Sequence, residues 1–357
     1  MLVAANQMKV SVNRLLADPE FYLFNYQARE GTSEFLIVNE ELLGRAPFVD
    51  IRLAPFARGQ FTISTADLTD LVGNEPGTRP RQHFIFHHAF VCSTLLARCL
   101  AESDAFFSLK EPQILRQLSD LKRESGANGE LPRGWGRVLK THLQLLAKNY
   151  SHGNQVVIKA SNVSNNLVED VIDHSPDSQL IYLHSSLPEF LVANLKKPGE
   201  TRRKIPDLLA RVAAYSDFLE TCPQFRELGR ASFLETCGLL WLASHYNFLH
   251  HCRAADNGRV RTLAMRDFLA EPAAVLTRVC RFFGHDPSPA ELRRMTDDAI
   301  LARHSKDPNQ KYDEHTRSVE NARVYRQHAA EISAVVSRLD PVTRELDIPA
   351  RLEGMAL

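Results

Sequence analysis

The sequence lacks an excess of charge of either sign and a long apolar run. Its 357 residues carry 43 Lys and Arg against 43 Asp and Glu, so no overall field draws it to nucleic acid or to an anionic membrane. No stretch reaches the ~18 apolar residues of a membrane span, and Lys9 and Arg14 interrupt the apolar start. We therefore predict a cytoplasmic protein with neither a nucleic-acid nor a membrane partner, in which any anion site is local.

Cysteine motifs are also missing. The six cysteines are far apart, with no CxxC pair and no spacing typical of zinc ligands or a disulfide framework. Buried or idle thiols are the simplest interpretation. Since 44% of the residues are hydrophobic and 24% are charged, the chain has the composition of a globular protein. Its length suits one large domain or two smaller ones.

Apolar runs that alternate with helical patterns predict the fold. HFIFHHAF, from His83, leads directly into the helical STLLARCLAES, and QVVIKAS, SQLIYLHSS and RVRTLAM follow with helical segments between them. Four buried strands separated by helices indicate an α/β fold whose parallel sheet is flanked by helices.

Two further regions flank this α/β unit. The alternating segments SEFLIVN and FVDIRLA predict short strands before the turn-rich GNEPGTRPR, and residues 315–339 predict one long surface helix. We thus expect a small N-terminal elaboration over 1–80, an α/β domain over 81–314 and a C-terminal helix and tail over 315–357.

The turn after the first buried strand is a candidate phosphate site. In HHAFVCSTLLA a short loop separates the strand from a helix start at Ser93 and Thr94. The free N–H groups and positive dipole end of such a helix attract anions, and the two hydroxyls add donors. We expect residues 88–94, His88 included, to cradle a phosphate. The loop lacks GxxxxGK[ST], so a plain turn capped by Ser93 stays an alternative.

Five segments in order resemble the sulfotransferase family. They are FIFHHAFVCSTLLARCLAE, LKEP, VVIKASN, LIYLHSSLPEFLVAN and RTLAMRDFLAEPAAVLTRVCRFFG, which together span roughly residues 83 to 312. The resemblance implies a P-loop NTPase-like sulfotransferase fold and 3′-phosphoadenosine 5′-phosphosulfate (PAPS) as donor. It further implies a small-molecule or peptide acceptor and no metal.

The sequence departs from the family pattern in the loop. Phe90 stands where the family carries Arg or Lys, and Cys92 where it carries the loop glycine. The resemblance implies that Cys92, Ser93 and Thr94 lie against the donor.

A second departure concerns the donor's 3′-phosphate. Ser186 takes the place of the family's arginine and Asn194 that of its serine, while a shift of one residue would substitute Ser185. His184 is adjacent. A serine cannot provide the paired charged hydrogen bonds of a guanidinium, so cations from elsewhere must meet a 3′-phosphate.

Two basic clusters are candidates for those cations. NLKKPGETRRKIP holds Lys196, Lys197, Arg202, Arg203 and Lys204, and RHSKDPNQKYD holds Arg303, His304, Lys306 and Lys311. We expect the loop from Lys196 to Lys204, Arg202 and Arg203 included, to bind the phosphate with help from Arg303 and Lys306. The alternative for each cluster is a solvated basic patch.

Glu111 and Lys159 are the candidate catalytic residues. Glu111, in LKEP, is predicted to take the proton of an acceptor hydroxyl or amine, and Lys159 to neutralise charge on the transferred group from the end of its strand. A cap or an ion-pair partner is the alternative for Glu111. His142, in KTHL, lies in a helical pattern and is not expected at the site. His87 and His88 point opposite ways on extended chain, which disfavours a shared metal.

Two other functions stay open. The missing loop cation favours a non-catalytic nucleotide-binding or partner-binding protein on the same fold. A P-loop kinase is disfavoured because the sequence has no GK[ST] pair to hold phosphate and magnesium.

Overall fold

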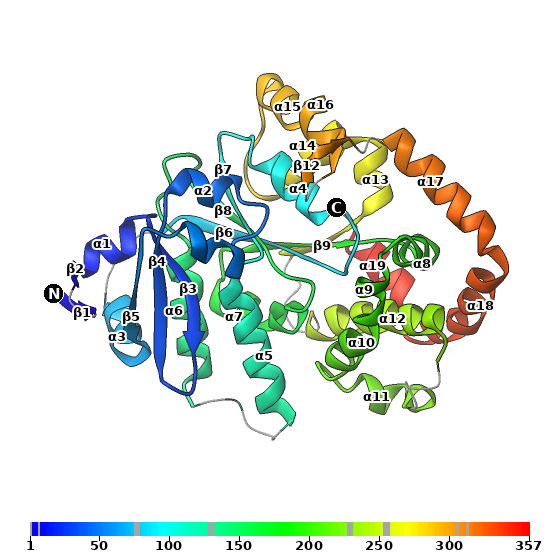
Figure 1. Cartoon of the computed structure of the whole chain (residues 1–357), viewed down its shortest axis with the longest axis horizontal. Coiled ribbons are helices and arrows are strands. Elements are labelled where there is room, and N and C mark those ends of the chain that lie inside the picture. The colour runs from blue at the N-terminus through cyan, green and yellow to red at the C-terminus, as the bar shows by residue number, and fades with distance from the viewer. Residues whose placement is uncertain are drawn as a thin grey trace.

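A five-stranded parallel sheet forms the centre of the computed structural model, which describes residues 2–5, 8–74, 79–127, 131, 133–226, 231–252, 258–304, 307–311 and 314–357 (Figure 1). Its strand order is β10-β9-β6-β8-β7, with every pair parallel. The strands are β6 Arg81–His87, β7 Phe106–Lys110, β8 Gln155–Lys159, β9 Gln179–His184 and β10 Val260–Ala264. The predicted α/β class is confirmed.

β7 is the strand that the apolar pattern did not predict. It reads FFSLK, and all five of its residues are buried. Ser108 and Lys110 interrupt the apolar run, so the sequence identified only a strand end or loop before Glu111. The Lys110 ammonium is satisfied inside the protein by the carbonyls of Gly44, at 2.7 Å, and Ser108, at 3.1 Å.

Helices cover both faces of this sheet (Figure 1). One face packs on α4 Ser93–Leu100, α13 Met265–Ala270, α14 Pro272–Phe282 and α15 Pro289–Met295. The other packs on α5 Gln113–Ala127, α6 Trp135–Leu146, η2 Asn165–Leu167, α7 Val168–His174 and α12 Phe233–His251. Burial on both faces explains why the strands are continuous apolar runs.

The N-terminal elaboration holds an antiparallel sheet, in the order β3-β4-β5. Its elements are β1 Leu2–Ala5, β2 Met8–Ser11, α1 Val12–Ala17, β3 Phe21–Gln27, β4 Thr32–Ile37, α2 Glu40–Arg45, η1 Ile51–Phe56, β5 Gly59–Ser64 and α3 Thr65–Asn74. SEFLIVN forms β4 as predicted. FVDIRLA does not form a strand, because the Asp50 carboxylate caps the 3-10 helix η1 by accepting from the Arg52 N–H.

Short helices lie between β9 and β10, and one more short helix and a small two-stranded sheet follow later in the chain. They are α8 Leu187–Leu195, α9 Gly199–Arg203, α10 Ile205–Ala213, α11 Phe218–Thr221, η3 Pro223–Phe225, α16 Asp298–Leu301, β11 Arg303–His304 and β12 Asp307–Lys311. The expected single helix over 315–339 is instead two, α17 Glu314–Gln327 and α18 Ala329–Glu345, which are separated at His328.

The chain ends beside the central sheet. After α19 Ile348–Gly354, Ala356 forms a parallel bridge to Thr262 of β10. The Leu357 N–H donates to the Thr262 carbonyl at 3.0 Å. Among the described helices, none combines the length and the apolar content needed to cross a membrane.

Candidate functional site

The carboxyl ends of the parallel strands bring the predicted site residues to one edge of the sheet. β7 ends before Glu111, β8 at Lys159, β6 before His88 and β9 at His184. Ligands of open α/β sheets bind at this edge. The order of the strands places the ends of β6 and β7 on either side of β8, about 10 Å apart.

Backbone strain is concentrated at this edge. Phe90, Cys92 and Glu111 have positive φ angles of 65°, 60° and 55°. Among the described residues, Asp347 is the one other non-glycine residue with a positive φ. Positive φ costs a side-chain-bearing residue free energy, and strained residues of this kind cluster at functional sites.

Cys92 is the residue that precedes the first turn of α4. It makes no side-chain capping bond, and Ser93 is the first residue of the helix rather than its cap; a plain turn and a phosphate-binding turn both stay predictions. The first N–H groups of a helix have no acceptor within the helix. The start of α4 therefore keeps the electrostatic character of an anion site.

The hydroxyl residues at this helix start are covered. Ser93 is 5% exposed and Thr94 is 3% exposed, so neither faces an open crevice. The Lys197 ammonium lies 4.5 Å from the centroid of the Phe90 ring. Both hydroxyl residues are thus enclosed by the protein.

α17 contributes to this cover. The Arg317 guanidinium donates to Cys92 Sγ at 3.4 Å, and Lys196 pairs with Glu320 at 3.0 Å. Burial raises the pKa of the Cys92 thiol, and the positive charges of Arg317, Lys196 and Lys197 oppose that rise. Three cations therefore surround the loop.

Arg317 was missed by the sequence analysis. It lies in a polar helix beyond the segments that resemble the family, and no local motif marks it. Only the fold, which lays α17 beside α8, brings it to residue 92 (Figure 1).

Glu111 and Lys159 form an ion pair at the ends of β7 and β8. The Lys159 side chain is 1% exposed and that of Glu111 is 21% exposed. The Glu111 N–H donates to the Lys159 carbonyl at 2.7 Å, which fixes the two residues side by side. Phe48 adds its ring 5.9 Å from the ammonium. The pair is thus held from the protein side, and the carboxylate is the more accessible partner.

His88 is a buried neutral histidine. Its Nε2 accepts the Ser185 N–H at 2.9 Å, so its Nδ1 carries the proton donated to the Ala89 carbonyl. Burial lowers its pKa to about 3. Burial also lowers the pKa of the half-buried His184 to about 4, against the opposing charge of Asp267. Neither histidine is a cation at pH 7.

The two polar residues expected at a 3′-phosphate have local partners. Ser186 caps α8 in a capping box with Glu189, and Asn194 is buried and donates to the Phe190 carbonyl at 2.8 Å. Their binding of a donor stays a prediction.

The expected cations differ in their surroundings. Arg202 donates to the Lys197 carbonyl at 2.8 Å and to the Leu195 carbonyl, closing the end of α8. Arg203 is exposed. Lys306 lies outside the described residues. The phosphate role of all three stays a prediction.

His142 is in α6, as its helical pattern predicted. It is fully buried, and its Nδ1 donates to the Val138 carbonyl at 2.6 Å while its Nε2 contacts the Ser33 hydroxyl at 3.0 Å. It is part of the core and not of the strand-end site.

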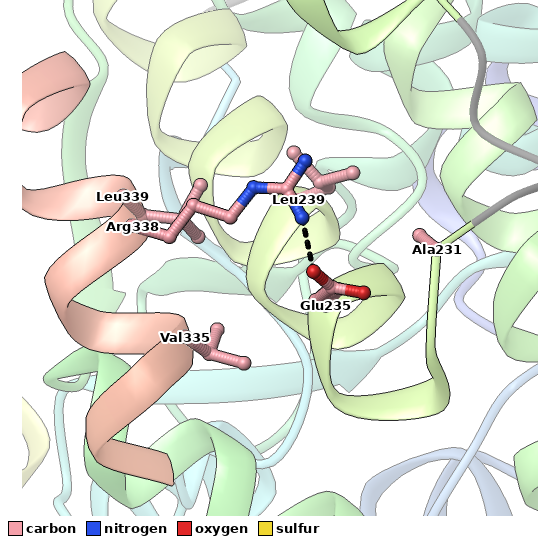
Figure 2. Close-up of a pocket in the computed structure, with 6 residues that line it drawn as sticks. All are labelled: Ala231, Glu235, Leu239, Val335, Arg338 and Leu339. Carbon is pink, nitrogen blue, oxygen red and sulfur yellow. Dashed lines mark hydrogen bonds and ion pairs between the residues drawn. The ribbon is translucent and has the colours of Figure 1, made fainter. Parts of the chain in front are cut away.

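A small cavity lies away from this edge, between the start of α12 and α18 (Figure 2). It measures about 20 Å³, which is room for a single water. The Glu235–Arg338 ion pair closes it. A side chain on Gly238 would come within 2.7 Å of Leu339, so the cavity is a packing gap between two closely crossing helices.

Among the described residues, no three His, Cys, Asp or Glu side chains are grouped to hold a metal ion.

Several solved structures are similar to this chain. A sulfotransferase domain from the curacin biosynthetic pathway is 16% identical with a TM-score of 0.43, covering 71% of this chain and 99% of that one. A sulfotransferase domain of the Synechococcus PCC 7002 olefin synthase is 18% identical with a TM-score of 0.36, covering 71% and 97%. A sulfotransferase from Alicyclobacillus acidocaldarius is 13% identical with a TM-score of 0.34, covering 74% and 96%.

These structures belong to the family that the sequence resembles. At such identities the likeness concerns the fold alone. No protein-family model and no curated protein matches the chain.

Proposed function

We propose that the chain transfers a sulfuryl group from PAPS to a hydroxyl or amine of a small-molecule or peptide acceptor. The observation that carries this proposal is the Glu111–Lys159 pair at two adjacent strand ends, on the same edge as the start of α4. This edge combines a carboxylate that can accept a proton, a buried ammonium that can stabilise a transferring anionic group, and a helix N-terminus that can bind a phosphate.

The donor's phosphates would be met by the loop and by the cations around it. A phosphate that leaves water needs charged or multiple donors. Arg317, Lys196 and Lys197 supply positive charge near Cys92. Because Ser93 and Thr94 are buried, the donor would have to displace the side chains that cover them.

Transfer then needs a group that takes up the acceptor's proton and a positive charge that stabilises the transferring group. The Glu111 carboxylate takes the proton from the acceptor O–H or N–H, and the acceptor atom attacks sulfur. The bond from sulfur to the donor's phosphate oxygen breaks, and adenosine 3′,5′-bisphosphate leaves with the electron pair. The Lys159 ammonium stabilises the charge that develops on the transferring group.

The Glu111→Gln variant tests this assignment. A positioned base contributes ~10²- to 10⁴-fold, so turnover on labelled PAPS with a responsive acceptor should fall by at least about 100-fold. Affinity for adenosine 3′,5′-bisphosphate should change little, since the carboxylate acts on the acceptor. The exposed Glu353→Gln serves as control. Equal losses of turnover and donor affinity, or no loss, would reject the role of Glu111.

A non-catalytic binding protein is the second candidate. Phe90 in place of a basic residue and the burial of Ser93 and Thr94 favour it. A chain that binds adenosine 3′,5′-bisphosphate yet transfers no sulfuryl group to any hydroxyl or amine acceptor tested would support this candidate over the enzyme.

A further inference from the structure

His87 ends the central strand directly before the loop and is 4% exposed. Ile85 pairs in register with Lys159 of β8, and residues two apart on a strand share a face. His87 is therefore on the same face of the sheet as Lys159. This is the face that α4 covers.

Both ring nitrogens of His87 face carbonyl oxygens. Nδ1 is 2.7 Å from the His88 carbonyl oxygen, and Nε2 is 3.0 Å from the Ala160 carbonyl oxygen, at the end of β8. A carbonyl oxygen only accepts hydrogen bonds. A neutral imidazole has one N–H and would point a lone pair at the other oxygen, whereas an imidazolium donates to both.

Two neighbouring histidines have the opposite arrangement. His88 accepts a backbone N–H at Nε2. His83, on the same strand, accepts the Gln179 N–H at Nδ1, at 3.4 Å, and has Nε2 2.7 Å from the Gln155 side-chain oxygen. Each of these rings meets one donor and one acceptor and is neutral. The pattern of partners, rather than burial, distinguishes His87 from them.

We propose that His87 is an imidazolium held beneath the loop, where its charge attracts the anionic donor and stands in for the basic residue that Phe90 replaces. This inference rests on the proposed function. His87 is a positioning residue, since its two N–H groups fix the carbonyls of residues 88 and 160 and thereby tie the loop to the end of β8. Hydrogen bonds from a charged donor are stronger than neutral ones, which offsets part of the cost of burial.

Nitrogen NMR of the full chain, labelled at histidine, reads the charge directly. At pH 7 without ligand, both ring nitrogens of His87 should carry a proton, whereas His83 should show one protonated and one bare nitrogen. The His87→Gln and His83→Gln variants assign the signals. A bare nitrogen on His87 at pH 7 would overturn the inference, whatever the protein binds.

The affinity for adenosine 3′,5′-bisphosphate measures whether the charge of His87 attracts the donor. Glutamine has one amide donor and no charge, so His87→Gln should weaken binding at least about ten-fold, as expected for a charge lost near an anion. His83→Gln should bind as the parent does. Equal affinity of parent and His87→Gln overturns the electrostatic role. If the parent itself fails to bind, the proposed function fails, and with it the donor-attracting role, while the NMR result still decides the charge.

Discussion

Burial is the first cause that keeps the buried histidines His83, His88 and His245 neutral. His83 and His88 each meet one donor and one acceptor and stay neutral, and the buried His245 donates from Nδ1 to the Trp241 carbonyl at 2.8 Å. Burial lowers the pKa of His83 to about 4 and that of His88 to about 3, and places that of His245 well below its usual value.

These lowered pKa values predict acid sensitivity. The unfolded chain takes up protons near pH 6.5, but the folded chain does not until about pH 4 or below, so the free energy of unfolding falls as the pH drops below 6.5. At pH 5 each such histidine should cost roughly 2 kcal/mol. Urea unfolding between pH 8 and pH 5 measures this. His83→Gln should flatten the dependence by close to one proton, and an unchanged slope would contradict the assignment.

Single residues were only partly predictable. The sequence predicted that Glu111 and Lys159 share a crevice, and the structure joins them as an ion pair; their catalytic roles stay predictions. Arg317 was not predictable, because its neighbours come from a segment more than 200 residues earlier. The positive φ of Cys92 was foreshadowed only by the glycine at that place in the resembling family.

At the scale of elements, continuous apolar runs predicted four strands of the central sheet. They failed where polar residues are buried with partners, as in β7, and where a side-chain cap overrides an alternating pattern, as in η1. The break between the two helices at His328 was also not predicted, because the helical pattern continues through it. α17 nonetheless brings Arg317 to Cys92 at the start of α4.

Arg317→Ala tests the role of α17. Removing this cation from beside Cys92 should weaken binding of adenosine 3′,5′-bisphosphate by several-fold or more and reduce its salt dependence. The exposed Arg326→Ala, on the same helix, should leave binding unchanged. Calorimetric titration at two salt concentrations measures both. Equal losses in the two variants would contradict a specific role for Arg317.

The paired variant Arg202→Ala/Arg203→Ala tests the cations predicted from sequence. Since Arg202 closes the end of α8 and Arg203 is exposed, its effect on binding should be smaller than that of Arg317→Ala. A larger loss of affinity, with thermal stability retained, would assign the phosphate to α9 instead.

At the scale of the whole molecule, one apolar cluster joins the N-terminal sheet to the α/β unit. Lys148, just after α6, is fully enclosed and donates to the carbonyls of Leu15 at 2.8 Å, Asp18 at 3.0 Å and Phe21. The sequence predicted an elaboration over 1–80, but not that a buried lysine ties it to the rest. That boundary itself stays a prediction.

Lys148→Met should destabilise the protein. Methionine keeps much of the apolar stem but leaves three carbonyls without this donor. Because a buried polar group without a partner costs about 1–3 kcal/mol, the free energy of unfolding should fall by at least about 2 kcal/mol. Lys140→Met, on the exposed side of α6, is the matched control. Urea unfolding of the full chain compares them, and equal stabilities would show that the tie contributes nothing.

Calorimetric titration of the unmodified chain tests the central claim most directly. Adenosine 3′,5′-bisphosphate, adenosine 5′-monophosphate and ATP are compared at one salt concentration. The three cations near Cys92 and the N-terminus of α4 predict saturable binding of the bisphosphate, at least about ten-fold tighter than the monophosphate because the 3′-phosphate adds charge-assisted hydrogen bonds. Absence of bisphosphate binding, or tighter binding of ATP, would contradict a sulfuryl-donor site at this edge of the sheet.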